Sequence, residues 1–473
     1  MACPAQTTKR SLAAGISLYC RRCLWVAVFT LCALALLQPL VVEAFHIPSG
    51  SMAPTLYGHH RIFVCPRCRH EVIVGRHAAD REGSGEPRYY RKVFCPNCGL
   101  HPLPLATTPE IPGDQIVVNK TAYLVRSPSR WEIIVFRLLG TFYIKRLVGM
   151  PGEEILIHDG DFYVNGQLYR KTFEEAKRMR VLVFDQENAP KAGGWKDRWE
   201  QSAAAGTPVF RRADSKPAHE VFQVGDLPHL TIDGRISPCA LTYRHFLLGS
   251  GKCEPICDEY GYNGGLHADS ECVHDFLIET EIEASAGRGS LALRLCDGHD
   301  WVEVVVPVGA SRAVETFAWP IDAPEQTRKL AEAEKPAWLR SKQPYRIELA
   351  FVDRRVSLAV DGRLWLCADL PEAKERRGVE RPFIVQADGV QATLRHFRLY
   401  RDVHYGQQGT NAVRGKSVHL AMDQYFMLGD NSPNSEDSRF WPDAGRVEAA
   451  CLIGPVIRVH ASKPPLRSRN WRL

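Results

Sequence analysis

The sequence has no long run of basic residues and no second apolar run of membrane-spanning length. Its 60 lysines and arginines stand against 54 aspartates and glutamates, a net charge of +6 that is spread along the chain. A dedicated nucleic-acid binder would gather such charge in one patch, so that class is excluded. Only residues 23–42 approach the roughly 20 apolar residues that a spanning helix needs, which excludes a polytopic membrane protein. The 473 residues suffice for two or three domains.

The apolar run is interrupted only by Thr30, Gln38 and Pro39, and four basic residues precede it. It exceeds the roughly 7 to 15 apolar residues of a signal-peptide core, which favours a transmembrane anchor at residues 23–44. By the positive-inside rule, residues 1–22 then stay in the cytoplasm and the rest of the chain is exported. The alternative is a cleaved signal peptide, with Val42 and Ala44 before the cut.

Residues 45–56 read Phe-His-Ile-Pro-Ser-Gly-Ser-Met-Ala-Pro-Thr-Leu. Ser49 and Ser51 flank a glycine, and Pro48 and Pro54 restrict the backbone on either side. A hydroxyl held exposed and immobile in such a loop is suited to act as a nucleophile. The same residues are equally typical of an ordinary loop. The choice therefore depends on whether a base lies elsewhere in the chain.

The 15 cysteines fall into groups. Two Cys-Pro-x-Cys motifs, Cys65 to Cys68 and Cys95 to Cys98, predict a zinc ribbon over residues 65–110. Four thiolates leave no open position on the metal, so its role would be structural. In an oxidising exterior the same four cysteines could instead form two disulfides. A second group could form one or two disulfides: Cys239, Cys253, Cys257 and Cys272.

From residue 112 the sequence changes to short β-rich runs separated by turn residues. Lys145 lies among apolar residues in one of these runs, where burial would lower its pKa and let it act as a neutral base. A lysine in a strand is more often a surface residue, so this role depends on its partners. Five strands of an all-β domain are predicted, at residues 115–118, 132–136, 142–148, 154–158 and 162–164.

Residues 205–405 are predicted to form an inserted β-sandwich. The dipeptide Asp361-Gly362 is a strong hairpin signal between two of its strands. The segment at residues 394–402 resembles the last strand of concanavalin-like jelly rolls, and the sequence does not indicate what such a domain would bind. Seven strands are expected, at residues 277–283, 290–295, 301–306, 345–351, 355–360, 363–368 and 391–399.

Residues 425–439 combine an apolar strand with a dense polar turn, in which Asp437 and Arg439 could pair. Three segments now stand in order: PSGSMAPTL, YIKRLVGMPGE and GDNSPNSEDSR. With PGDQIVVNK at residues 112–120, they closely resemble the signature boxes of type I signal peptidases, peptidase family S26. These are membrane-anchored serine proteases that remove signal peptides from exported proteins. The resemblance covers residues 23–64, 111–170 and 420–460, roughly a third of the chain.

The resemblance implies a role for individual residues. Ser51 matches the nucleophile and Lys145 the general base, while Ser49 matches an oxyanion-hole donor. No cofactor is implied for catalysis. The supporting positions match Ser435, which orients the lysine, Asp437 and Arg439 behind it, and Arg146. The family's shallow substrate pockets, which imply cleavage after small residues in an Ala-X-Ala pattern, match Phe45, Ile47, Pro48, Leu56, Tyr143 and Ile144.

The resemblance also implies an organisation. A mainly β catalytic domain, from residues 45–64, 111–170 and 420–473, would stand behind a single anchor on the outer or periplasmic face of the cytoplasmic membrane. Its partners would be exported preproteins and the lipid bilayer, without nucleic acid. Two features depart from the family pattern: the ribbon displaces Gly113-Asp114 from the nucleophile loop, and the sandwich replaces a smaller accessory region.

An alternative hypothesis, from another functional class, is a non-catalytic, membrane-tethered protein that binds glycan or peptide on a degenerate protease scaffold. The joint presence of four residues argues against it: Ser51, Lys145, Ser435 and Asp437.

Overall fold

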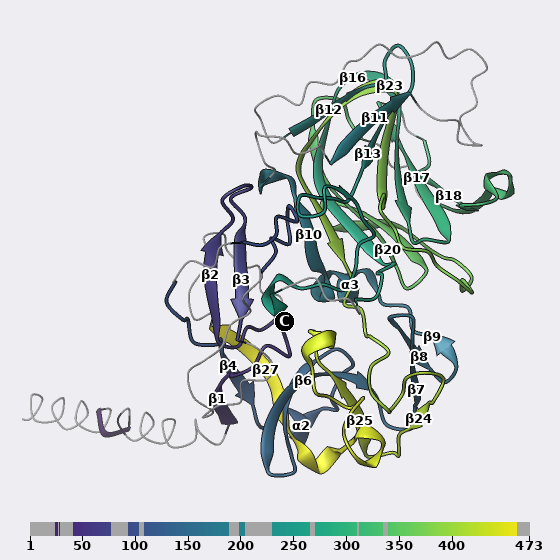
Figure 1. Cartoon of the computed structure of the whole chain (residues 1–473). Helices are drawn as coiled ribbons and strands as arrows, with labels where there is room; N and C mark the ends of the chain where they lie inside the picture. The colour runs from purple at the N-terminus through teal and green to yellow at the C-terminus, as the bar shows by residue number, and fades with distance from the viewer. Residues whose placement is uncertain are drawn as a thin grey trace, which may run out of the picture.

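The computed structural model describes residues 24–26, 28, 41–76, 93–103, 108–188, 198–203, 229–264, 270–309, 312–333 and 339–460. The fold is mainly β, as predicted, and Figure 1 shows two β-rich bodies. In the described part of the chain, no helix has the length and apolar character to cross a membrane. Most of the predicted anchor lies outside these ranges. Its predicted end at residue 44 needs correction, because strand β1 (Val42–His46) begins inside it.

The first body is organised around a seven-stranded antiparallel sheet. Distant parts of the chain meet in it, because β4 pairs with β1 on one side and with β27 on the other. The strand order is β1, β4 (Gln115–Asn119), β27 (Leu452–His460), β5 (Ile133–Leu138), β6 (Thr141–Gly149), β25 (Gln424–Leu428) and β26 (Arg446–Glu448). A smaller sheet has the order β24 (Val418–His419), β7 (Glu154–His158), β8 (Asp161–Val164) and β9 (Gln167–Leu168).

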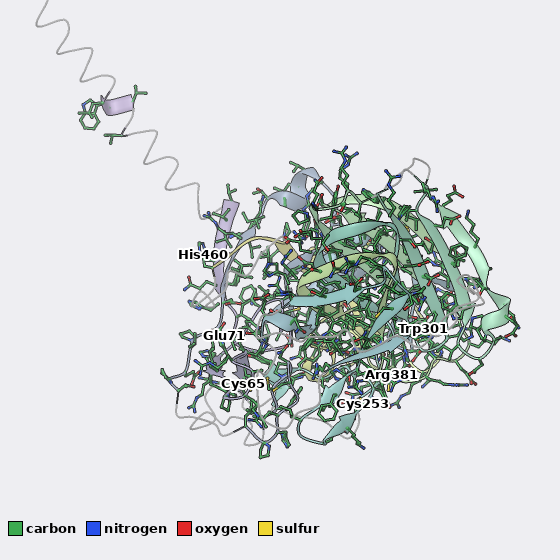
Figure 2. All side chains as sticks on the ribbon, turned by 90° about the horizontal axis from the view of Figure 1, so that it is seen from above. Cys65, Glu71, Cys253, Trp301, Arg381 and His460 are labelled. Atoms are coloured by element: carbon green, nitrogen blue, oxygen red, sulfur yellow. The ribbon has the colours of Figure 1, made fainter. Side chains whose placement is uncertain are left out.

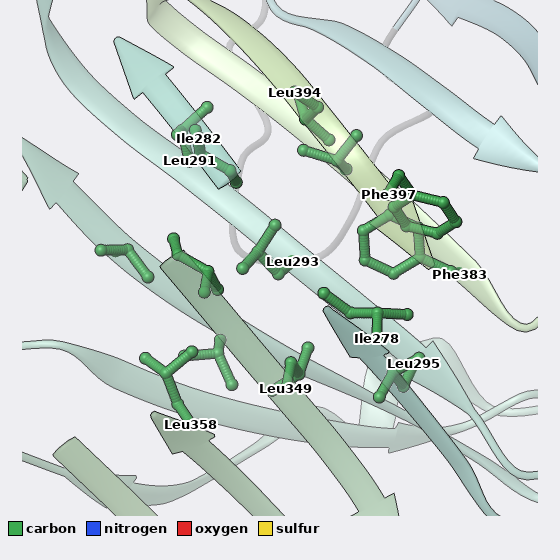
Figure 3. Close-up of a cluster of buried hydrophobic side chains, with 14 of the residues drawn as sticks. Ile278, Ile282, Leu291, Leu293, Leu295, Leu349, Leu358, Phe383, Leu394 and Phe397 are labelled. Carbon is green, nitrogen blue, oxygen red and sulfur yellow. The ribbon is translucent and has the colours of Figure 1, made fainter. Parts of the chain in front are cut away.

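The second body is built on two long strands, β16 (Phe276–Cys296) and β23 (Phe383–Arg401), which pair along their whole length. The first half of β16 also pairs with β20 (Pro344–Val352), and its second half with β17 (Asp300–Val308). The register shifts between these halves, near Gly287, where bulges interrupt the pairing and bend the strand. Both faces bury one apolar core, part of which Figure 3 shows: Ile278, Ile282, Leu291, Leu293, Leu295, Leu349, Leu358, Phe383, Leu394 and Phe397.

The remaining strands of this body extend the same network. Two of them precede residue 205, so the sheet begins earlier than the predicted range of 205–405. Asp361 and Gly362 have φ of 50° and 75°, as the predicted tight hairpin requires. The strands are β10 (Val181–Asp185), β11 (Trp199–Ala203), β12 (His229–Asp233), β13 (Cys239–Tyr243), β18 (Glu315–Pro320), β19 (Arg328–Glu332), β21 (Arg355–Val360) and β22 (Arg363–Asp369).

Several short elements lie outside the sheets described above. The helix α3 (Phe173–Met179) starts at a capping box in which Thr172 and Glu175 bond each other's backbone. The hairpin of β2 (His60–Val64) and β3 (Glu71–Gly75) carries the first cysteine pair in the loop between its strands. Figure 2 places Cys65 and Glu71 on this hairpin, away from Trp301 of the second body. The other short elements are α2 (Ala122–Val125), β14 (Phe246–Leu247) and β15 (Lys252–Cys253).

Candidate active site

Lys145 lies in β6 with only 3% of its surface exposed. Its Nζ donates a hydrogen bond of 3.2 Å to Ser435 Oγ. Burial disfavours the charged amine and lowers its pKa from 10.5 to about 8. The carboxylate of Asp437 opposes this shift, and the guanidinium of Arg439 adds to it. A substantial fraction of this amine is therefore neutral slightly above pH 7.

The turn that contains Ser51 is tied to the loop that contains Ser435. Asn431 donates twice to this turn, from its backbone N to Ser51 O at 3.0 Å and from Nδ2 to Gly50 O at 2.9 Å. A Cβ on Gly429 would lie 2.5 Å from Ser51 O and 2.2 Å from Ser435 Oγ. The close approach of the two serine segments thus requires glycine at this position. Ser51 remains half-exposed.

Residues 65–110 separate Gly113 and Asp114 from the Ser51 turn in sequence. In the structure both residues nevertheless contact the segment that contains this turn. Asp114 O accepts from Ile47 N at 2.9 Å, and Asp114 Oδ2 accepts from Tyr57 N at 2.9 Å. A Cβ on Gly113 would lie 1.8 Å from Ile47 O. The inserted residues 65–110 therefore leave the contact between these two segments in place. Ser49, within the turn, is exposed.

Asp437 and Arg439 form a fully buried ion pair behind Ser435. Arg439 Nε and Nη2 each donate to Asp437 at 2.9 Å, and Asp437 Oδ2 also accepts from Gly429 N at 3.1 Å. Burial by itself raises the pKa of Asp437, but Arg439 outweighs that cost and holds it below its usual range. Arg439 Nη1 also donates to Ser432 Oγ at 2.8 Å, which fixes the polar loop.

Arg146 has a partner that the sequence reasoning did not identify. Its Nε donates to Asp430 Oδ1 at 2.7 Å, and its Nη1 donates to Trp131 O at 2.7 Å. Asp430 is fully buried, and its backbone carbonyl accepts from the hydroxyl of Tyr260 at 2.8 Å. The sequence held one signal for this ion pair, because Asp430 lies in the segment GDNSPNSEDSR, which had already been identified as part of the site.

The six expected pocket residues do not lie together. Ile47 and Leu56 are buried in one apolar cluster, with Phe45 and Ile144 partly buried against it, while Pro48 is exposed. Tyr143 packs on the other side of the sheet from Ile144, because successive residues of a strand point to opposite faces. Its ring lies 5.1 Å from that of Trp441, in a second cluster with Phe136.

A segment from the second body contacts the turn, which no sequence pattern indicated. The Tyr262 hydroxyl donates to His59 O at 3.1 Å, and a Cβ on Gly50 would lie 1.9 Å from the Tyr262 ring. Asn263 Nδ2 donates to Asn431 Oδ1 at 2.7 Å, and Asn431 Nδ2 donates in return to Asn263 Oδ1 at 2.8 Å. Asn431 therefore connects this segment to Gly50.

The four ribbon cysteines are buried with all four Sγ atoms within 4.8 Å of one another. The distance is 3.8 Å between the Sγ atoms of Cys65 and Cys98, and 3.5 Å between those of Cys68 and Cys95. A tetrahedral site with metal–sulfur bonds of about 2.3 Å has sulfur–sulfur edges of about 3.8 Å. All four cysteines are free in the structure, and their arrangement could hold a metal ion.

The chain matches the family described as "Signal peptidase, peptidase S26" over residues 106–244 and 368–460. These residues include Lys145 and the 425–439 turn, but not Ser51. The signal peptidase I of Rickettsia akari is 26% identical over 151 residues, which cover 31% of this chain and 44% of the relative. That of Rickettsia conorii is 26% identical over 238 residues, covering 46% and 73%. The first match spans less than half of the relative's length.

These similarities support the peptidase S26 signal peptidase family, and with it a serine protease at the level of the family. Among solved structures, a carbohydrate binding module from Bacillus subtilis matches 28% of this chain and 78% of its own chain, with 18% identity and a TM-score of 0.21.

Proposed function

We propose that the chain is a signal peptidase I that cleaves N-terminal signal peptides from exported preproteins. The observation that carries the proposal is the buried Lys145, with a lowered pKa and a hydrogen bond to Ser435, whose loop is bonded to the turn of Ser51 through Asn431. A surface lysine would show neither feature. A non-catalytic binding protein would have no use for a desolvated amine at this place, because burying it costs stability.

In this mechanism the neutral amine of Lys145 takes the proton from Ser51 Oγ as the oxygen attacks the scissile carbonyl. The leaving amine departs with a proton, and an acyl-enzyme remains that water hydrolyses. The Ser51 amide and the Ser49 hydroxyl donate to the oxyanion, and a single such donor is typically worth ~10²–10³ in rate. Ser435 accepts from Nζ and holds the lysine, while Asp437 and Arg439 hold the loop of Ser435. No step needs a cofactor.

Substrate selection is assigned to the apolar cluster beside the turn. Phe45 and Ile144 keep accessible surface there, Ile47 and Leu56 form its floor, and the exposed Pro48 follows Ile47 in the chain. A shallow apolar surface of this kind favours small side chains before the cut, in an Ala-X-Ala pattern.

The proposed location is the outer or periplasmic face of the cytoplasmic membrane, with the apolar run that begins at residue 23 as a single anchor that ends before β1, and residues 1–22 in the cytoplasm. Because few residues separate the anchor from Ser51, the turn would lie close to the bilayer, where signal peptides emerge.

The four ribbon cysteines are proposed to bind one structural zinc ion, because four thiolates complete the coordination of the metal and leave no position for substrate. The inserted sandwich remains a separate domain in this proposal, and a bound ligand is not assigned to it.

The test is cleavage of a preprotein in detergent or liposomes by the full chain. We expect Ser51→Ala and Lys145→Ala each to lose nearly all turnover, since both groups act in the same step. Ser127→Ala and Lys416→Ala are matched controls at exposed positions and should retain full activity. Cleavage at the wild-type rate by Ser51→Ala or Lys145→Ala would contradict the mechanism.

A further inference from the structure

Cys257 and Cys272 lie opposite each other across an isolated antiparallel bridge. Their neighbours make the flanking hydrogen bonds, from Asp258 N to Glu271 O at 3.0 Å and from Val273 N to Ile256 O at 2.9 Å. The cysteines therefore occupy a non-hydrogen-bonded pair, in which opposite Cα atoms lie about 4.5 Å apart. Disulfides span Cα distances of about 4.4 to 6.8 Å. The backbone already has the geometry that a disulfide needs.

We propose that Cys257 and Cys272 form a disulfide once the chain is in an oxidising compartment, and that this bond closes the segment that contacts the turn of Ser51. Both thiols are half-buried, so a small oxidant reaches them. The proposed function supplies the compartment and the role of the turn, and this inference rests on it for those two points.

The closed segment contains the short 3₁₀ helix η2 (Gly261–Asn263), which reaches the turn in two ways. The ring of Tyr262 packs on Gly50, where even a Cβ would collide with it. Asn263 exchanges two hydrogen bonds with Asn431, which in turn donates to Gly50 O. Both side chains lie between Cys257 and Cys272 in the chain, and the neighbouring Ile256 is bonded to the second body, where its N donates to Val379 O at 3.1 Å. A bond between the two cysteines restricts the freedom of the backbone that carries Tyr262 and Asn263.

The chemistry requires a disulfide of low molecular weight as oxidant, for which oxidised glutathione serves. Burial and the neighbouring Cys272 raise the pKa of Cys257, so the first attack is assigned to Cys272. The Cys272 thiolate forms a mixed disulfide and releases one glutathione thiolate, which takes up a proton. Cys257 then loses its proton, attacks the sulfur of Cys272 and releases the second glutathione. Two protein thiols are oxidised, and one glutathione disulfide is reduced to two thiols.

The experiment treats the full chain in detergent with oxidised glutathione and maps cysteine linkages by mass spectrometry after non-reducing digestion. We expect a peptide pair joined through Cys257 and Cys272, with the two hydrogens lost, which a phosphine reductant separates. Cys257→Ser should abolish the linkage, and Cys367→Ser, at an exposed cysteine on β22, should leave it unchanged. If a variant folds poorly, the linkage map of the wild-type chain still tests the proposal.

A second measurement tests the role of the segment. Amide exchange at Tyr262 and Asn263 should slow in the oxidised chain by up to about 100-fold, the limit that closing a loop of about 15 residues provides. Reduction should reverse this in the wild type and change nothing in Cys257→Ser.

Glutathione left on either cysteine, a linkage to Cys253 instead, or equal exchange in both redox states overturns the proposal. A formed linkage in a chain that cleaves no preprotein supports the disulfide and contradicts the proposed function. Cleavage of preprotein by a chain whose Cys257 and Cys272 stay reduced supports the proposed function and contradicts the disulfide.

Discussion

The pH dependence of cleavage tests the assignment of Lys145 as the base. With a pKa of about 8, roughly 10% of the amine is neutral at pH 7 and roughly 90% at pH 9. Since only the neutral form accepts a proton, kcat/KM should rise about tenfold across this interval and then level off. The ascending limb belongs to the free enzyme, so it should appear in kcat/KM with substrate well below KM.

Asp437→Asn is the informative perturbation of this profile. The Asp437 carboxylate favours the charged amine, and its removal also leaves the buried Arg439 without its partner. Both changes disfavour protonated Lys145. A neighbouring charge typically moves a pKa by about 1 unit or more, so the limb should move from about pH 8 to about pH 7 or below. The neutral fraction at pH 7 then rises from roughly a tenth to about half.

The control is Glu436→Gln, which removes an equal charge that is exposed and screened by water. Its limb should shift by a small fraction of the Asp437→Asn shift. The assay is the initial rate of preprotein cleavage between pH 6 and 10, normalised to each plateau so that a lower maximal rate does not obscure the midpoint. An unmoved midpoint in Asp437→Asn, or one displaced to higher pH, would refute the electrostatic account of this lysine.

Two further predictions concern the turn and the ribbon. Gly50→Ala places a Cβ 1.9 Å from the Tyr262 ring, so kcat/KM should fall at least tenfold; adding Tyr262→Ala should recover part of the loss, as a double-mutant cycle measures. Independent effects of the two changes would contradict the contact. The chain purified under reducing conditions should hold one zinc ion, and Cys98→Ser should lower both the metal content and the melting temperature. Metal-free protein with four ribbon cysteines in disulfides would show that the site is not a metal site.

The sequence by itself determined the local elements and the order of the site segments. Strands β7 and β21 have the predicted bounds, because their alternation ends at strong turn residues. The type of turn at Asp361-Gly362 follows from backbone preferences of the two residues alone. The pairing of Asp437 with Arg439 is similarly local, since only one residue separates them.

The tertiary structure decided what depends on contacts between distant segments. The predicted strands at residues 277–283 and 290–295 are one strand, β16. The residues near Gly287 resemble a turn in sequence, but in the structure they form bulges within the pairing of β16 with β23. The partner of Arg146 is Asp430, 284 positions away, and the neighbour of Gly50 is Tyr262 from the inserted body. Spacing in a sequence carries no information about such contacts, since they depend on how sheets twist and pack. The lowered pKa of Lys145 belongs here as well, because burial by residues far along the chain produces it.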